Sequence, residues 1–167
     1  CKATTFDFTK PMADRRLFKT VELSTTPYTR QDKDAPIMVV PDAEAKIRET
    51  IKHLFFRLLG ETVEASSDDV TKVYGLFVDV WKDLEQWDHD NPNKGGQNLA
   101  NGRCVADVDY DKSIHFETIN NQVRAVFEPL AQRPDKAPYQ PGMKLDRDEF
   151  YTLRSWQTVV TYMLTNY

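Results

Sequence analysis

The chain has 167 residues, which is enough for one domain with a single hydrophobic core and too few for two. Its 22 basic and 26 acidic side chains give a formal net charge of −4, and this balance provides no basic surface for a nucleic-acid partner. The uninterrupted apolar runs are only a few residues long, so no segment has the length of a membrane-spanning helix.

The first residue of the chain is a cysteine, Cys1. Because synthesis begins with methionine, a cysteine here indicates either that an upstream segment has been removed or that the sequence is trimmed. Cleavage directly before a cysteine is typical of the bacterial lipoprotein pathway, and in this feature the chain resembles a processed bacterial lipoprotein. The resemblance implies a covalent lipid on Cys1. It also implies an exported protein that this lipid anchors in the bacterial cell envelope, in the periplasm or at the outer membrane surface.

The second cysteine, Cys104, is the only disulfide partner that the sequence offers to Cys1. An acylated Cys1 leaves Cys104 unpaired, whereas an unmodified Cys1 can form a disulfide with it, and the two outcomes exclude each other. Neither cysteine belongs to a Cys-x-x-Cys pair, which argues against a structural zinc site, a thioredoxin-type redox pair or an attached haem.

Residues 1–41 are predicted to form an extended arm or tether. The segment is rich in Thr and interrupted by Pro11, Pro27, Pro36 and Pro41, and a segment of this composition buries little apolar surface. A terminal segment is usually mobile unless something holds it. We therefore expect the arm to lie either on its own domain or on a neighbouring subunit, and the second arrangement would make the chain part of an assembly.

Residues 42–167 are predicted to form a single, mainly α-helical domain, a small bundle of about four helices. The first helix begins at Asp42, an N-cap residue type, and ends before Gly60, which suits the left-handed position after a helix. Its apolar residues recur with helical spacing and form one stripe, made of Ile47, Ile51, Leu54, Phe55, Leu58 and Leu59.

The second predicted helix begins at Ser66 or Ser67, and Ser66 with Asp69 matches the capping-box pattern. Its apolar face is formed by Val70, Val73, Tyr74, Phe77, Trp81 and Leu84. Only a short connection separates the first two helices, so we expect them to pack side by side in opposite directions.

Residues 86–111 are predicted to be an irregular insert, because Asn, Gly and Asp accumulate there. A long irregular insert in a compact domain usually has a function or makes a contact. Trp87, His89 and Asn93 lie in this insert and are candidates for contact with a protein partner. Trp87 is the strongest of them, since the other two tryptophans fall on apolar helix stripes.

Two further helices are predicted. The third covers about 116–132, with Pro129 near its end as a breaking residue. The last begins at Asp146, with Glu149 at the position that completes a capping box, and keeps helical apolar spacing to the end of the chain. Because no helix-ending signal precedes Tyr167, this residue is a further candidate for contact with a partner.

Three segments resemble a known group of proteins. His53–Gly60, Ser66–Phe77 and Arg154–Tyr167 are similar to helical segments in large exported proteins of unknown function from planctomycetes and myxobacteria. The similarity rests on apolar spacing and a few polar positions over about two thirds of the chain. Those proteins often carry a separate cytochrome-like module, which this chain lacks. The resemblance implies an exported helical domain and carries over no catalytic residue.

Alternating carboxylates at Asp107, Asp109 and Asp111 suggest one metal site, because such oxygens can face a single calcium ion. An EF-hand loop that starts at Asp107 needs Gly at its sixth position and Glu at its twelfth, where this chain has Lys112 and Thr118. A solvated acidic strand or turn is the alternative interpretation. No other cofactor is expected apart from the lipid on Cys1.

The sequence has no nucleophile elbow, phosphate-binding loop, dinucleotide fingerprint or paired-histidine motif, so we do not predict an enzyme. We expect a non-enzymatic structural or accessory subunit, exported and lipid-anchored, that binds and positions other protein subunits in a bacterial envelope or extracellular assembly. The alternatives are a calcium- or ligand-binding module of an exported protein, and an enzyme with an unrecognised site.

Overall fold

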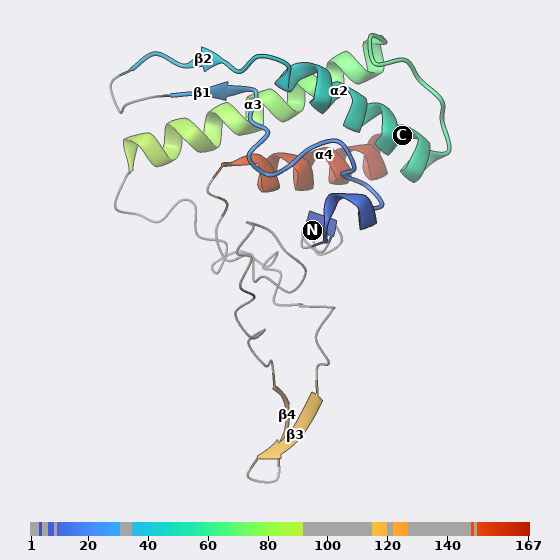
Figure 1. Cartoon of the computed structure of the whole chain (residues 1–167), viewed down its shortest axis with the longest axis vertical. Coiled ribbons are helices and arrows are strands. Elements are labelled where there is room, and N and C mark those ends of the chain that lie inside the picture. The colour runs from blue at the N-terminus through green and yellow to red at the C-terminus, as the bar shows by residue number, and fades with distance from the viewer. Residues whose placement is uncertain are drawn as a thin grey trace.

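The computed structural model describes residues 4, 7–8, 10–30, 35–91, 115–119, 122–126, 148 and 150–167, of which 115–119 and 122–126 are described by their backbone alone. Three α-helices dominate this part of the chain: α2 (Ala43–Leu54), α3 (Asp68–Asp90) and α4 (Thr152–Asn166). α3 packs against both α2 and α4, and Figure 1 shows α2 and α3 running in opposite directions, as predicted. The prediction of a mainly helical protein is confirmed.

The first predicted helix is present, although its start differs in detail. α2 continues after Leu54 as a π-helical turn, η2 (Phe55–Leu59), and the chain then leaves the helix at Gly60 with φ of 73° in the left-handed region. Asp42 lies at the N-cap position, but its side chain accepts no hydrogen bond from the helix, so its predicted capping role is wrong. The apolar stripe faces the core, with Ile47, Ile51, Leu54 and Phe55 fully buried and Leu58 and Leu59 packed against them.

The second predicted helix begins at Ser67. The Ser67 hydroxyl oxygen accepts a hydrogen bond from the backbone N–H of Val70 at 3.3 Å, which is the usual N-cap contact. Ser67 rather than Ser66 is therefore the capping residue. The buried face of α3 includes Val70, Val73, Phe77 and Trp81, with Tyr74 packed at its edge.

The end of α3 corrects the predicted start of the irregular insert. The helix continues to Asp90, so residues 86–90 are helical and not part of a loop. It ends where Asn91 precedes Pro92, since the proline ring disfavours helical backbone at the residue before it. The accumulation of Asp and Asn that suggested a loop thus begins within the last helical turn.

The last helix begins later than predicted. α4 starts at Thr152, and the acid at its beginning is Asp148, whose two carboxylate oxygens accept the backbone N–H groups of Leu153 at 3.0 Å and Arg154 at 2.9 Å. Burial raises the pKa of Asp148, while these two hydrogen bonds act in the opposite direction. Asp146, the predicted cap, lies outside the described residues. The predicted apolar spacing is confirmed, because the buried face contains Leu153, Trp156, Val159, Val160 and Met163.

The predicted helix at 116–132 is wrong over the part that is described. β3 (His115–Ile119) and β4 (Gln122–Val126), orange in Figure 1, form an antiparallel hairpin. In the sequence, the two strands are separated by Asn120 and Asn121, and asparagine is a residue type that is common in two-residue hairpin turns. Strand formation is also favoured by the β-branched residues Thr118, Ile119, Val123 and Val126.

The described part of the N-terminal segment is not an extended tether. It contains a short 3-10 turn, η1 (Met12–Asp14), and a two-stranded antiparallel ribbon of β1 (Tyr28–Thr29) and β2 (Met38–Val39). Four of its apolar side chains are buried in the same core as the helices: Phe8, Phe18, Val21 and Leu23. Of the two predicted arrangements, the described residues adopt the first, in which the segment lies on its own domain.

Two buried charges organise this segment. The Arg15 guanidinium, which is only 2 % exposed, donates to the backbone carbonyls of Lys10 at 3.0 Å and Val21 at 2.8 Å and pairs with Glu22 at 2.7 Å. The Asp7 carboxylate accepts three consecutive backbone N–H groups, at positions 16, 17 and 18, at 2.8, 2.8 and 3.0 Å. These contacts satisfy backbone groups that no helix or strand pairs, which allows an irregular segment to be packed into a core.

Candidate functional site

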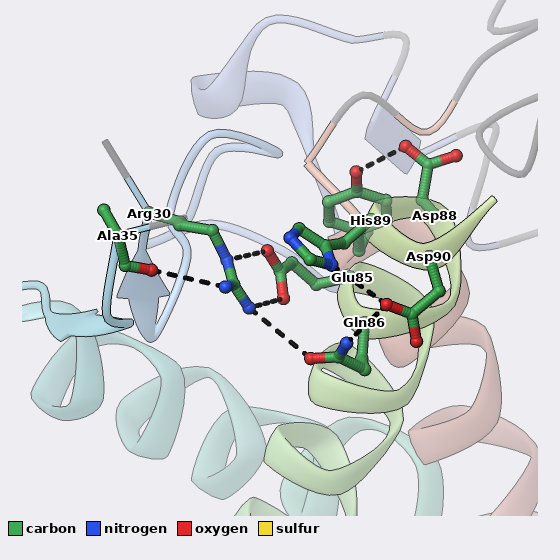
Figure 2. A network of polar contacts seen from close by, with 8 residues as sticks. Arg30, Ala35, Glu85, Gln86, Asp88, His89 and Asp90 are labelled. Carbon is green, nitrogen blue, oxygen red and sulfur yellow. Dashed lines mark hydrogen bonds and ion pairs between the residues drawn. The ribbon is translucent and has the colours of Figure 1, made fainter. Parts of the chain in front are cut away.

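A network of polar contacts lies at the C-terminal end of α3 (Figure 2). Its centre is a two-point ion pair between Arg30, next to β1, and Glu85 on α3, with Nε to Oε1 at 2.7 Å and the second nitrogen to Oε2 at 3.0 Å. Figure 2 shows the Arg30 guanidinium lying between Glu85 and the backbone carbonyl of Ala35, which accepts its other terminal nitrogen at 3.3 Å. The bond to Glu85 raises the pKa of Arg30, so this cation stays charged.

The network continues along the exposed side of the helix. The amide oxygen of Gln86 accepts from Arg30 at 3.5 Å, and its amide nitrogen donates to Asp90 at 2.9 Å. His89 Nδ1 lies 3.0 Å from the same Asp90 oxygen. The hydrogen bonds from Gln86 and His89 lower the pKa of Asp90, so this carboxyl is ionised at neutral pH.

The segment before α4 fixes the same end of α3. The Tyr151 hydroxyl donates to Asp88 at 2.9 Å, and the indole N–H of Trp81 donates to the carbonyl of Phe150 at 2.9 Å. The last turns of α3 are therefore held from the N-terminal ribbon on one side and from the start of α4 on the other.

Trp87 lies on this fixed turn. The predicted loop does not begin at Trp87, because this residue is helical, and 46 % of its surface is exposed. Its carbonyl accepts the side-chain amide of Asn91 at 2.8 Å. The structure thus brings two of the predicted contact residues, Trp87 and His89, to the same end of one helix.

Tyr167 lies elsewhere. Its hydroxyl donates to Asp69, in the first turn of α3, at 3.0 Å, and its ring stands edge-on against Phe55 with centroids 5.2 Å apart. Burial and the bond to Asp69 raise the pKa of Tyr167. The helix from position 69 to position 89 is about 30 Å long at 1.5 Å per residue. Tyr167 therefore does not share a surface with Trp87 and His89.

Several predicted sites lie outside the described residues. They are the lipidation site Cys1 and its alternative disulfide partner Cys104, the contact residue Asn93, and the calcium ligands Asp107, Asp109 and Asp111. The lipid anchor, the envelope location and the calcium site stay predictions. Within the part of the chain that the structure describes, no three His, Cys, Asp or Glu side chains gather where they could hold a metal ion.

Sequence reasoning missed Arg30, Glu85 and Gln86. One signal was available, because Glu85 follows Trp81 by four positions and so falls on the buried face of α3, where a carboxylate needs a partner. Nothing in the sequence identifies that partner, since Arg30 comes 55 positions earlier.

Comparison with known protein families, curated proteins and solved structures finds no match to this chain. The resemblance to exported helical proteins consequently stays a prediction. Among the helices that the structure describes, none combines the length and the apolar character that crossing a membrane requires.

Proposed function

We propose that this protein acts by binding other proteins, as a non-enzymatic accessory subunit of a larger assembly, and that the C-terminal end of α3 is its contact surface. The observation that carries the proposal is Trp87, a tryptophan with 46 % of its surface exposed on a helical turn whose neighbours are fixed. Tryptophan contributes strongly to protein interfaces because its ring buries a large apolar area and its N–H can still be hydrogen-bonded.

The surroundings of Trp87 support this role. The ion pair of Arg30 with Glu85 and the contacts of Gln86 and His89 with Asp90 hold the charged side chains in place before any partner binds. Side chains that are already ordered lose less conformational entropy on binding.

Site-specific photocrosslinking tests the proposal. A photoreactive phenylalanine analogue at Trp87, introduced in the cells that produce the protein, is expected to yield a discrete covalent adduct with one protein. The matched control places the same analogue at Asp79, an exposed position on α3 about 12 Å away along the helix. Adduct formation that is equal at the two positions, or absent from both, would contradict the proposal.

Affinity measurements provide the second step. Once the crosslinked partner is identified, the Trp87→Ala variant is expected to bind it at least about tenfold more weakly than the wild type. Asp79→Ala is expected to bind it normally, and circular dichroism verifies that both variants fold.

A further inference from the structure

The outer edge of strand β2 is an unused hydrogen-bonding edge. β2 pairs with β1 in the register Tyr28 opposite Val39 and Thr29 opposite Met38, and the N–H of Val40 donates to the carbonyl of Pro27 at 3.1 Å. In an antiparallel ladder, hydrogen-bonded and non-hydrogen-bonded pairs alternate. Val40 and Pro27 form a hydrogen-bonded pair. The next pair, Val39 and Tyr28, is therefore not hydrogen-bonded, and the pair of Met38 and Thr29 is hydrogen-bonded again.

It follows that the N–H and C=O groups of Val39 point away from β1. The same alternation turns the backbone groups of Ile37 in that direction. No hydrogen bond from any residue that the structure describes reaches these four groups. In Figure 1, β2 lies on the outer side of the ribbon, with β1 between it and α3.

The side chains at this edge are apolar and exposed. Met38 is 40 % and Val39 is 69 % exposed, although both are large hydrophobic residues. The segment from Pro36 to Pro41 contains no charged side chain. Strands at sheet edges usually carry charges, because an exposed apolar edge is a template for another strand. Here the flanking residues Pro36 and Pro41 have no backbone N–H to donate, so they limit strand pairing to the four residues between them.

We propose that β2 pairs with β2 of a second copy of this chain, antiparallel and across a two-fold axis, so that two ribbons join into a four-stranded sheet. In this arrangement Ile37 lies opposite the second copy's Val39, and Met38 lies opposite its own counterpart. Each of the two Ile37 and Val39 pairs exchanges two hydrogen bonds, which satisfies all the outward backbone groups of both copies.

The edge is self-complementary, and this selects a second copy as the occupant. In the proposed register every cross-strand neighbour is apolar, with Ile37 against Val39 on one face and Met38 against Met38 on the other. No like charges oppose each other, because the segment is uncharged. Because the two-fold pairing uses the same β2 edge of both copies, this edge is fully occupied when two copies have joined. The proposed dimer uses the outer backbone edge of β2 and does not require Trp87.

Sedimentation equilibrium of the full chain tests the dimer. The wild type is expected to show a monomer–dimer equilibrium, and Val39→Pro should weaken the dimerisation constant at least about tenfold, since it removes one of the outward N–H groups. The substitution leaves the pairing with β1 intact, because that N–H is not part of it. Leu164→Lys, which removes a 60 % exposed apolar side chain from α4, is the control and should leave dimerisation unchanged. Circular dichroism verifies that both variants fold.

Disulfide trapping tests the register. In a Cys1→Ser and Cys104→Ser background, Met38→Cys is expected to form a crosslinked dimer on mild oxidation, because directly opposite residues of a non-hydrogen-bonded pair bring their Cβ atoms close enough for a disulfide. Val39→Cys should crosslink much more slowly, since it faces Ile37. A monomer at every concentration would overturn the proposal, and so would a dimer that Val39→Pro does not weaken or that position 38 does not crosslink.

Discussion

Replacement of Arg15 by alanine is the most direct test of the N-terminal packing. Arg15 is 2 % exposed and its guanidinium binds the carbonyls of Lys10 and Val21 as well as Glu22, while its charge lies 5.2 Å from the centre of the Phe8 ring. The substitution therefore removes a charged donor from these two backbone acceptors and from the more distant carbonyl of Phe18 at 3.5 Å, and we expect a large loss of stability.

The magnitude follows from the partners. Glu22 is 38 % exposed, so water screens its loss and the ion pair itself contributes little. The two shorter carbonyl bonds, to Lys10 and Val21, come from a charged donor and contribute about 1.5–3 kcal/mol each. We expect the free energy of unfolding to fall by about 4 kcal/mol. At 2–4 °C per kcal/mol for a chain of this size, this corresponds to roughly 8–16 °C in melting temperature.

The control is the next residue in the chain. Arg16 is exposed, and Arg16→Ala removes the same type of side chain from the same segment. We expect it to change stability by less than about 0.5 kcal/mol. Urea unfolding followed by circular dichroism measures both variants. Equal midpoints for Arg15→Ala and Arg16→Ala would refute the packing, because a mobile tether predicts the same small effect for both.

Four further substitutions probe the helices. Gly60→Ala should lower the free energy of unfolding by about 1 kcal/mol, because φ there is 73°. Gly75→Ala, inside α3, should raise it by about as much, since alanine favours helix more than glycine does. At both positions the new methyl group meets open space, so urea unfolding should show changes of opposite sign. Asp148→Ala should cost about 1–2 kcal/mol, since two backbone N–H groups at the start of α4 lose their acceptor, and a loss below 0.5 kcal/mol would contradict this role. Burial raises the pKa of Tyr74 from 10.0 to about 12, so the folded state holds the phenol proton more tightly. Stability should therefore fall as the pH rises between these values, and Tyr74→Phe should remove that part of the pH dependence.

The sequence predicted the three described helices because their information is local. In α2, α3 and α4 the apolar residues recur every three or four positions, and Ser67 and Gly60 supply a cap and a stop. The same spacing rule failed for the hairpin. Ile119, Val123 and Val126 have steps of four and three, which fit a helix, although β-branched residues and the Asn pair between the strands favour a hairpin.

The candidate site was predicted only in part. The sequence alone predicts Trp87 as a contact residue, because the other two tryptophans fall on apolar helix stripes and Trp87 does not. The network that fixes its surroundings joins Arg30 to Glu85 across 55 positions of sequence, and no local pattern connects them.

What the sequence determined by itself is therefore the set of helices and their buried faces, since periodicity and capping act within a few residues. The tertiary structure alone decided that the N-terminal segment is part of the core. Phe8, Phe18 and Leu23 have no periodic spacing, and the burial of Arg15 and Asp7 runs against the usual exposure of charged residues. Their burial becomes favourable only when the folded backbone supplies carbonyl and N–H partners, and those partners do not exist until the chain is folded.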